Sequence, residues 1–198
     1  MDAITSFALA SGLSCANGIR LYASLFIVGL LAKFAHITLP QSLQMLTQPM
    51  VIGISGLLMV VEFIADKILY VDSAWDSVQT FIRIPAGAVL VMAAMNSTDL
   101  MTPTIASLLG GSLTGITHAT KAGSRALINT SPEPVSNITT SLGEEGLLSG
   151  GGWLALVHPA IFLGVLGLLI ILMLWMLPKL WRGIRLVITS LRSLFSVN

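Results

Sequence analysis

The sequence predicts an all-α integral membrane protein, a bundle of five or six transmembrane helices in a single domain that covers residues 1–198. Hydrophobic residues make up 55% of the chain and charged residues only 10%, whereas soluble domains carry about 25% charged residues. The mean hydropathy is +0.89, so the expected partner of the surface is a lipid bilayer. The net charge of +1 gives no sign of a nucleic-acid partner.

Five apolar segments account for the predicted spans, because crossing a bilayer takes about 20 mostly apolar residues. The first is interrupted by Asn17, Gly18 and Arg20, which predicts a broken helix. The fourth is rich in Gly, Ser and Thr, which is typical of closely packed membrane helices. The segments cover residues 4–34, 50–64, 77–95, 103–128 and 153–177.

The tail, residues 179–197, is predicted to be a basic amphipathic helix. Arg182, Arg185 and Arg192 share one side, which favours a helix lying in the membrane interface, with a short sixth span as the alternative. Bases are retained on the inner side, so we expect a multi-pass protein of the bacterial inner membrane with a cytoplasmic C-terminus. Residues 129–152, rich in Pro, Ser and Gly, are then predicted to be an irregular external loop.

A weak internal repeat divides the chain into candidate halves, residues 1–97 and 100–198. Residues 16–24 resemble residues 121–129, sharing a glycine and an arginine, and residues 48–61 resemble residues 158–172, sharing a proline and a GxxG. Each half would hold three helices, so a duplication predicts halves of opposite orientation, as in many transporters. Chance similarity in a biased alphabet remains the alternative.

The stretch from residue 62 to residue 85 gathers ionisable groups in a chain that otherwise has few. Glu62 and Asp66 are four residues apart and share a helix face, while Asp66-Lys67 is also typical of a helix leaving the membrane. A base at the centre of a membrane helix costs at least about 2.5–3.5 kcal/mol, so Arg20 and Arg125 need partners. One interpretation is a path for a substrate or ion, formed by Asn17, Arg20, Glu62, Asp66, Lys121 and Arg125.

The other interpretation is that these charges are structural ion pairs which fix helix packing. A structural charge network is in either case expected from Lys67, Asp72, Asp76 and Arg83. No enzyme is predicted, because the chain lacks the GxSxG, HExxH, Walker and Rossmann patterns. No cofactor or metal site is predicted either, since Cys15 is the single cysteine and His118 and His158 stand without ligand partners at usable spacing.

The block EFIADKILYVDSAWDSVQTFIRIPAGAVL, residues 62–90, resembles the signature of a widespread bacterial family of small polytopic membrane proteins catalogued as a domain of unknown function. That signature reads Glu-Phe-x-Ala-Asp-Lys, then Asp-x-x-Trp-Asp, then Arg-Pro; here Ile84 separates Arg83 from Pro85. The resemblance extends to the ANGIRLYASL stretch and to the glycine-rich fourth segment. It implies a common membrane fold and supplies no substrate.

The leading functional hypothesis is a transporter or channel for a small ion or small polar solute, acting as a homo-oligomer. The alternatives are a non-transporting membrane scaffold or assembly factor, and a protein that binds lipid headgroups through its bases. Transport predicts solvent-accessible charged residues at membrane depth, and a scaffold predicts charges paired internally. A lipid-binding protein predicts a groove that opens sideways, with the bases at headgroup depth.

Overall fold

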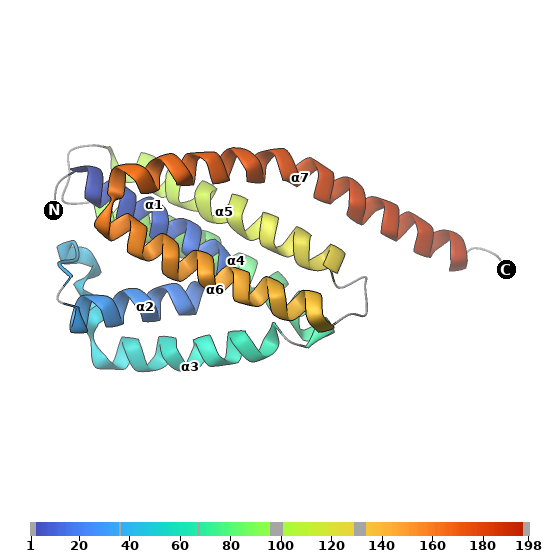
Figure 1. Ribbon diagram of the computed structural model, residues 1–198, viewed down its shortest axis with the longest axis horizontal. Helices are drawn as coiled ribbons and strands as arrows, with labels where there is room; N and C mark the ends of the chain where they lie inside the picture. The colour runs from blue at the N-terminus through green and yellow to red at the C-terminus, as the bar shows by residue number, and fades with distance from the viewer. Residues whose placement is uncertain (1–2, 36, 67, 96–100, 129–133, 196–198) are drawn as a thin grey trace.

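All secondary structure in the described residues is helical. The computed structural model describes residues 3–35, 37–66, 68–95, 101–128 and 134–195. The helices are α1 (Ala3–Ile19), α2 (Leu21–Phe34), the 3-10 helix η1 (Gln41–Thr47), α3 (Pro49–Ala65), α4 (Leu69–Met95), α5 (Pro103–Ile128), α6 (Pro134–Val157) and α7 (Pro159–Phe195). Figure 1 shows α2 and α3 along one side of the bundle and α7 along the other.

Helices α1, α4 and α5 form the centre of the bundle, where each packs against the other two. Glycines allow this close approach. A Cβ at Gly110 of α5 would overlap the Gly87 carbonyl of α4, and one at Gly18 of α1 would overlap the Thr117 hydroxyl of α5. Small residues at such interfaces let membrane helices approach closely. The glycine-rich fourth segment is therefore a packing helix at the centre of the fold.

The predicted interruption in the first apolar segment is confirmed at Arg20, which has extended backbone angles (φ −147°, ψ 96°) between α1 and α2. A helix that ends leaves its last carbonyls without helical partners. In α1 these include the carbonyls of Gly18 and Ile19, which instead accept hydrogen bonds from basic side chains of α4 and α5. The break therefore places polar backbone carbonyls, bound by basic side chains, inside the bundle.

The prediction of an irregular loop at residues 129–152 is wrong for the described residues, because residues 134–157 form α6. Proline, serine and glycine favour irregular structure, but propensity is a weak prior that tertiary packing overrides. Here α6 packs against α1 and α7. The expectation that this segment is external stays a prediction, and residues 129–133 of the predicted loop lie outside the described residues.

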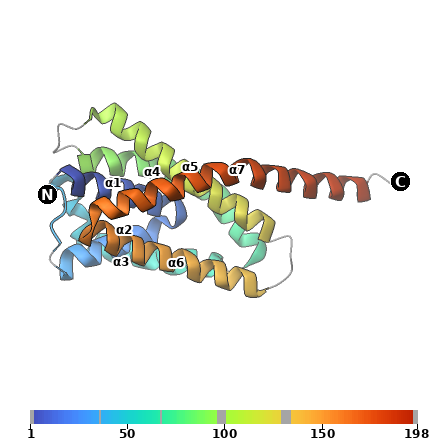
Figure 2. The same cartoon turned by 45° about the horizontal axis from the view of Figure 1, so that its top comes forward.

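Two further boundaries differ from the expected ones. The apolar segment 153–177 is divided at His158, where α6 ends and Pro159 opens α7, as expected from the preference of proline for the first helical turn. The basic tail is not a separate helix, because α7 continues through Pro178 to Phe195. Its C-terminal part extends beyond the other helices (Figure 2).

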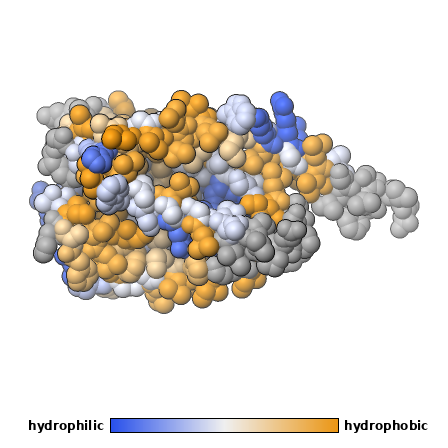
Figure 3. Space-filling view, in the orientation of Figure 1, coloured by the Kyte–Doolittle hydropathy of each residue, from blue (hydrophilic) through white to orange (hydrophobic). Residues whose placement is uncertain are grey.

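Apolar helices long enough to cross a membrane are present. Residues 74–95 of α4 and 159–189 of α7 meet that requirement, and η1 with α3, bent by 67°, is a third candidate. Only 11% of the most apolar 18-residue stretch of α7 is buried inside the protein. Apolar side chains cover most of the face shown in Figure 3. The interior, in contrast, holds fully buried Arg20, Arg83, Arg125 and Glu62, the reverse of the distribution in soluble proteins.

Candidate functional site

Arg20, at the break between α1 and α2, joins three carboxylates from two other elements. Its Nη2 lies 2.7 Å from Asp66 Oδ2 at the end of α3, its Nε 3.3 Å from Glu144 Oε2 of α6, and its Nη1 3.5 Å from Glu145 Oε1. Arg20 and Asp66 are each 1% exposed, whereas the Glu145 side chain is 44% exposed. Asp66, at the end of α3, is therefore buried inside the protein, and the interpretation that Asp66-Lys67 marks where a helix leaves the membrane stays a prediction.

Arg125, in the last turn of α5, approaches the same two buried carboxylates. Its Nη2 lies 3.2 Å from Glu144 Oε1 and 3.8 Å from Asp66 Oδ2, and it donates a hydrogen bond of 2.9 Å to the Ser141 hydroxyl. Arg20 and Arg125 were paired by the weak sequence repeat, and each follows a helix end or lies near one. The two arginines therefore share Asp66 and Glu144 between them.

Lys121, one helical turn before Arg125 on α5, reaches the broken end of α1. Its Nζ donates a hydrogen bond of 3.0 Å to the carbonyl of Ile19. Three carboxylates surround the same nitrogen, with Asp66 Oδ1 at 3.7 Å, Glu144 Oε2 at 3.8 Å and Asp76 Oδ1 at 3.9 Å. Lys121 is thus held between α1, α3, α4 and α6 without a close ion pair to any one carboxylate.

Arg83 of α4 forms the second centre of the network. It pairs with the fully buried Glu62 through Nη2, and its Nη1 lies 3.3 Å from Asp76 Oδ1. Nη1 also donates to the carbonyls of Gly18 and Ile19, each at 3.3 Å. Glu62 and Asp66 therefore serve different bases, although one helix turn separates them.

His118 of α5 is held in one tautomer by its neighbours. Arg83 Nη1 lies 3.1 Å from His118 Nδ1, and a guanidinium only donates, so Nδ1 is the acceptor and Nε2 carries the proton. Nε2 then donates to Thr80 Oγ1 at 2.6 Å, and that hydroxyl donates to the Asp76 carbonyl at 2.9 Å. The imidazole is therefore neutral and orients Arg83.

Several buried oxygens around these bases accept no hydrogen bond within the described part of the chain. They are Asn17 Oδ1, Glu62 Oε2, Gln79 Oε1 and both carboxylate oxygens of Asp66 and Asp76. For Asp66 the 2.7 Å approach of Arg20 is an ion pair whose direction does not satisfy a hydrogen bond. Unpaired buried acceptors are rare and mark strained or functional places.

Asn17, also fully buried, fixes the position of Arg83 from α1. Its Nδ2 donates to the Arg83 carbonyl at 2.7 Å, while Pro85 lies two residues further along α4. All six residues proposed for a path lie around the α1–α2 break, together with Asp76 and Arg83 of the expected structural network. Lys67 and the side chain of Asp72 fall outside the described part of the structure.

Sequence reasoning missed Glu144 as a member of the site. It assigned Glu144 and Glu145 to a loop, whereas α6 brings both to Arg20. A usable signal was present: these acids stand in a stretch without any base, while Arg20 and Arg125 both required partners. Among the described residues, no three His, Cys, Asp or Glu side chains are placed to hold a metal ion.

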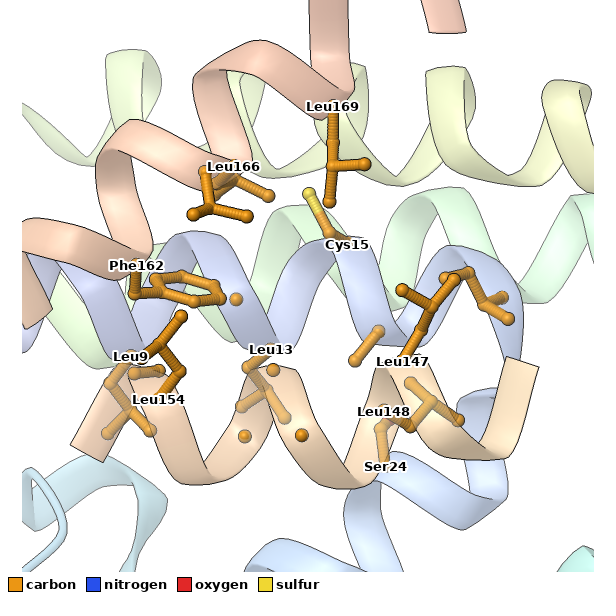
Figure 4. A pocket seen from close by; sticks show the side chains of 18 of the residues that line it. Leu9, Leu13, Cys15, Ser24, Leu147, Leu148, Leu154, Phe162, Leu166 and Leu169 are labelled. Carbon is orange, nitrogen blue, oxygen red and sulfur yellow. The ribbon is translucent and has the colours of Figure 1, made fainter. Parts of the chain in front are cut away.

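A separate apolar groove of about 310 Å³ lies between α1, α2, α6 and α7. Figure 4 shows Leu9, Leu13 and Cys15 of α1 facing Phe162 and leucines of α7, with leucines of α6 alongside. None of the described residues that line it is charged. The groove and the charge network are therefore distinct places in the fold.

A family described as a domain of unknown function, DUF4126, matches residues 7–179. The chain belongs to this family. The match covers Lys121, the three buried arginines Arg20, Arg83 and Arg125, and most of the bundle. None of the curated proteins and none of the solved structures compared with the chain matches it. The DUF4126 family supplies no activity, so function must be argued from the charge network itself.

Proposed function

We propose that this DUF4126 protein moves a small ion or small polar solute across a membrane, and that the charge network at the α1–α2 break is its path. The observation that carries the proposal is the gathering of four bases and four acids inside an apolar bundle. The bases are Arg20, Arg83, Lys121 and Arg125, and the acids are Glu62, Asp66, Asp76 and Glu144.

The cost of this arrangement supports a functional role. Each charge at the centre of a membrane helix costs at least about 2.5–3.5 kcal/mol, and replacing buried ion pairs with apolar residues is often neutral or stabilising. Packing alone therefore does not require a network of this size. Transporter binding sites are also typically built at breaks in membrane helices, and α1 ends at such a break beside the network. The network reaches the surface at Glu145, which is 44% exposed.

The membrane arrangement belongs to the same proposal. We propose five or six spans in the bacterial inner membrane, with the basic end of α7 in the cytoplasm. The two halves are proposed as inverted repeats, because Arg20 and Arg125 approach one shared pair of carboxylates. A homo-oligomer is proposed as well, since α7 exposes Leu168, Ile171 and Trp175 on its apolar surface.

A scaffold function is the second candidate, and one observation favours it. Each of the four bases has a carboxylate oxygen within 4.0 Å. The longest of these nearest-partner distances is 3.7 Å, between Lys121 Nζ and Asp66 Oδ1. The charges of a scaffold would form such pairs and never open to water. Headgroup binding gains less support, because the lining of the apolar groove carries no base among the described residues.

Transport is tested with purified protein in liposomes, by measuring fluxes of a panel of ions and small polar solutes against empty liposomes. Asp66→Asn keeps the shape of a side chain that three bases approach, so it should abolish any flux found. Lys33→Gln, which removes a charge outside the network, is the matched control and should leave the flux unchanged. A wild-type protein that moves none of the panel, while Asp66→Asn only loses thermal stability, contradicts transport and supports the scaffold.

A further inference from the structure

Lys121 differs from the three arginines of the network in how it is held. Its hydrogen bond goes to the Ile19 carbonyl at 3.0 Å, and its three carboxylate neighbours lie at nearly equal distances of 3.7, 3.8 and 3.9 Å. Arg20 and Arg125 instead have a carboxylate oxygen at 2.7 and 3.2 Å. The ammonium is therefore shared among carboxylates, which is the arrangement expected of a group that changes partners.

Chemistry separates Lys121 from the arginines as well. A guanidinium does not lose its proton in proteins, whereas a lysine ammonium loses its proton readily when it is buried. The Lys121 side chain is 3% exposed. Of the four bases that the structure places in the network, Lys121 is the one that carries an ammonium instead of a guanidinium.

Asp76 supplies a matching acceptor. It is 4% exposed, and neither of its carboxylate oxygens receives a hydrogen bond. Its contacts are long ion pairs, 3.3 Å to Arg83 Nη1 and 3.9 Å to Lys121 Nζ. A buried carboxylate with free lone pairs beside a shared ammonium can take a proton without first breaking a strong hydrogen bond.

We propose that Lys121 and Asp76 form a proton-exchange pair, and that the proton is the ion which this protein moves or couples to its substrate. The proposal rests on the transport function proposed above. In the exchange an N–H bond of Lys121 breaks and an O–H bond forms on Asp76. Ammonium and carboxylate become amine and carboxylic acid, so the net charge of the network is unchanged. The 3.9 Å gap closes by side-chain rotation or through one water.

A route to the surface runs through α6. Glu144 Oε2 lies 3.8 Å from Lys121 Nζ and 3.3 Å from Arg20 Nε, and Arg20 in turn contacts the half-exposed Glu145. Carboxylates on this route can carry the proton, while Arg20 stays charged and holds them together. In this proposal Glu145, the exposed carboxylate that Arg20 contacts, exchanges protons with the surroundings.

Charged groups from several helices around Lys121 set the electrostatic field at the proton-exchange pair. Near the break, α1 and α2 are joined by Arg20, and α7 packs an apolar residue, Leu180, against Gly123. Among the described residues, the other ionisable groups of the network are Glu62 of α3 and Asp66 at its end, Asp76 and Arg83 of α4, His118 and Arg125 of α5, and Glu144 of α6. Moving one proton within this nearly balanced set creates no new net charge.

The first test is infrared spectroscopy of the wild-type protein in lipid nanodiscs. The exchange predicts a carboxylic acid C=O band that shifts in D₂O, and Asp76→Asn should remove it. A wild-type protein whose spectrum shows no such band overturns the proposal, and this outcome does not depend on any variant folding.

The second test is proton flux into liposomes that contain a pH-sensitive dye, with a potassium gradient and valinomycin setting the potential. Lys121→Arg keeps the charge but cannot release a proton, so the flux should fall about 100-fold, the scale of a lost proton-transfer group. Lys33→Arg is the control and should match the wild type. Proton flux that survives in a folded Lys121→Arg protein overturns the proposal.

The two proposals fail in different ways. If another ion or solute crosses the membrane while protons do not, the transport function stands and the proton-exchange proposal is overturned. If no member of the panel crosses, protons included, both are overturned. Flux of protons together with a carboxylic acid band that Asp76→Asn removes supports both.

Discussion

Arg20 and Arg125 contact the same carboxylate, Glu144, although one lies at the break after α1 and the other in the last turn of α5. The Arg20 Nε–Oε2 distance is 3.3 Å and the Arg125 Nη2–Oε1 distance is 3.2 Å. Asp66 Oδ2 is shared by the same two arginines, at 2.7 Å from Arg20 Nη2 and 3.8 Å from Arg125 Nη2. Ion pairs thus link the ends of α1, α3 and α5 to α6, beside the Arg125–Ser141 hydrogen bond.

Replacing Glu144 with Gln should destabilise the protein by about 3–5 kcal/mol, because it removes the charge that two buried arginines share. The measurement is thermal unfolding of the purified protein in detergent. Glu145→Gln, at the next residue of α6, is the matched control. The Glu145 side chain is 44% exposed, and a surface pair contributes only about 0–1 kcal/mol. Equal melting of the two variants would show that Glu144 does not hold the arginines.

Glu62→Gln keeps the side-chain shape and leaves Arg83 without its fully buried partner. If Glu62 belongs to a working path, the variant should lose flux while expression and oligomer size stay intact. If Glu62 is only a structural partner, the variant should melt earlier by a loss of about 3–5 kcal/mol. A folded and fully active Glu62→Gln protein with unchanged melting contradicts both interpretations.

Gly18→Ala should loosen the packing of α1 on α5. Its Cβ would overlap the hydroxyl of Thr117 and lie 2.6 Å from the Thr114 backbone oxygen, and overpacking typically costs about 1–3 kcal/mol. Gly53→Ala in α3 is the control, because its Cβ would meet nothing within 4 Å and alanine favours a helix by about 1 kcal/mol. Opposite shifts in melting temperature are expected, and a stabilised Gly18→Ala protein would contradict the close packing.

The orientation of α7 is checked by cysteine labelling in cells. In a Cys15→Ala background, Thr189→Cys places a thiol at an exposed position of the basic end. A membrane-impermeant maleimide should label it only after the inner membrane is permeabilised, because basic segments are retained in the cytoplasm. Labelling in cells with an intact inner membrane places the tail outside and refutes the predicted topology.

Composition and spacing alone predicted a helical membrane protein whose buried bases require partners. The segment 103–128 coincides with α5, because a run of apolar and small residues between breaks leaves few other structures available in lipid. The family resemblance likewise rested on the order of residues along one stretch of the chain, 62–90, and the family match confirms the resemblance. The prediction that Arg20 interrupts the first helix succeeded for the same local reason.

Tertiary structure alone decided which acid meets which base. Local sequence placed Glu62 and Asp66 on one helix face, but the crossing of α4 and the helix break gave Glu62 to Arg83 and Asp66 to Arg20. Tertiary packing also decided that a glycine- and serine-rich segment forms the helix α6, whose Glu144 completes the network. A charge in a dry interior is stable only beside its partner, and partners far apart in sequence meet only once the whole bundle has assembled.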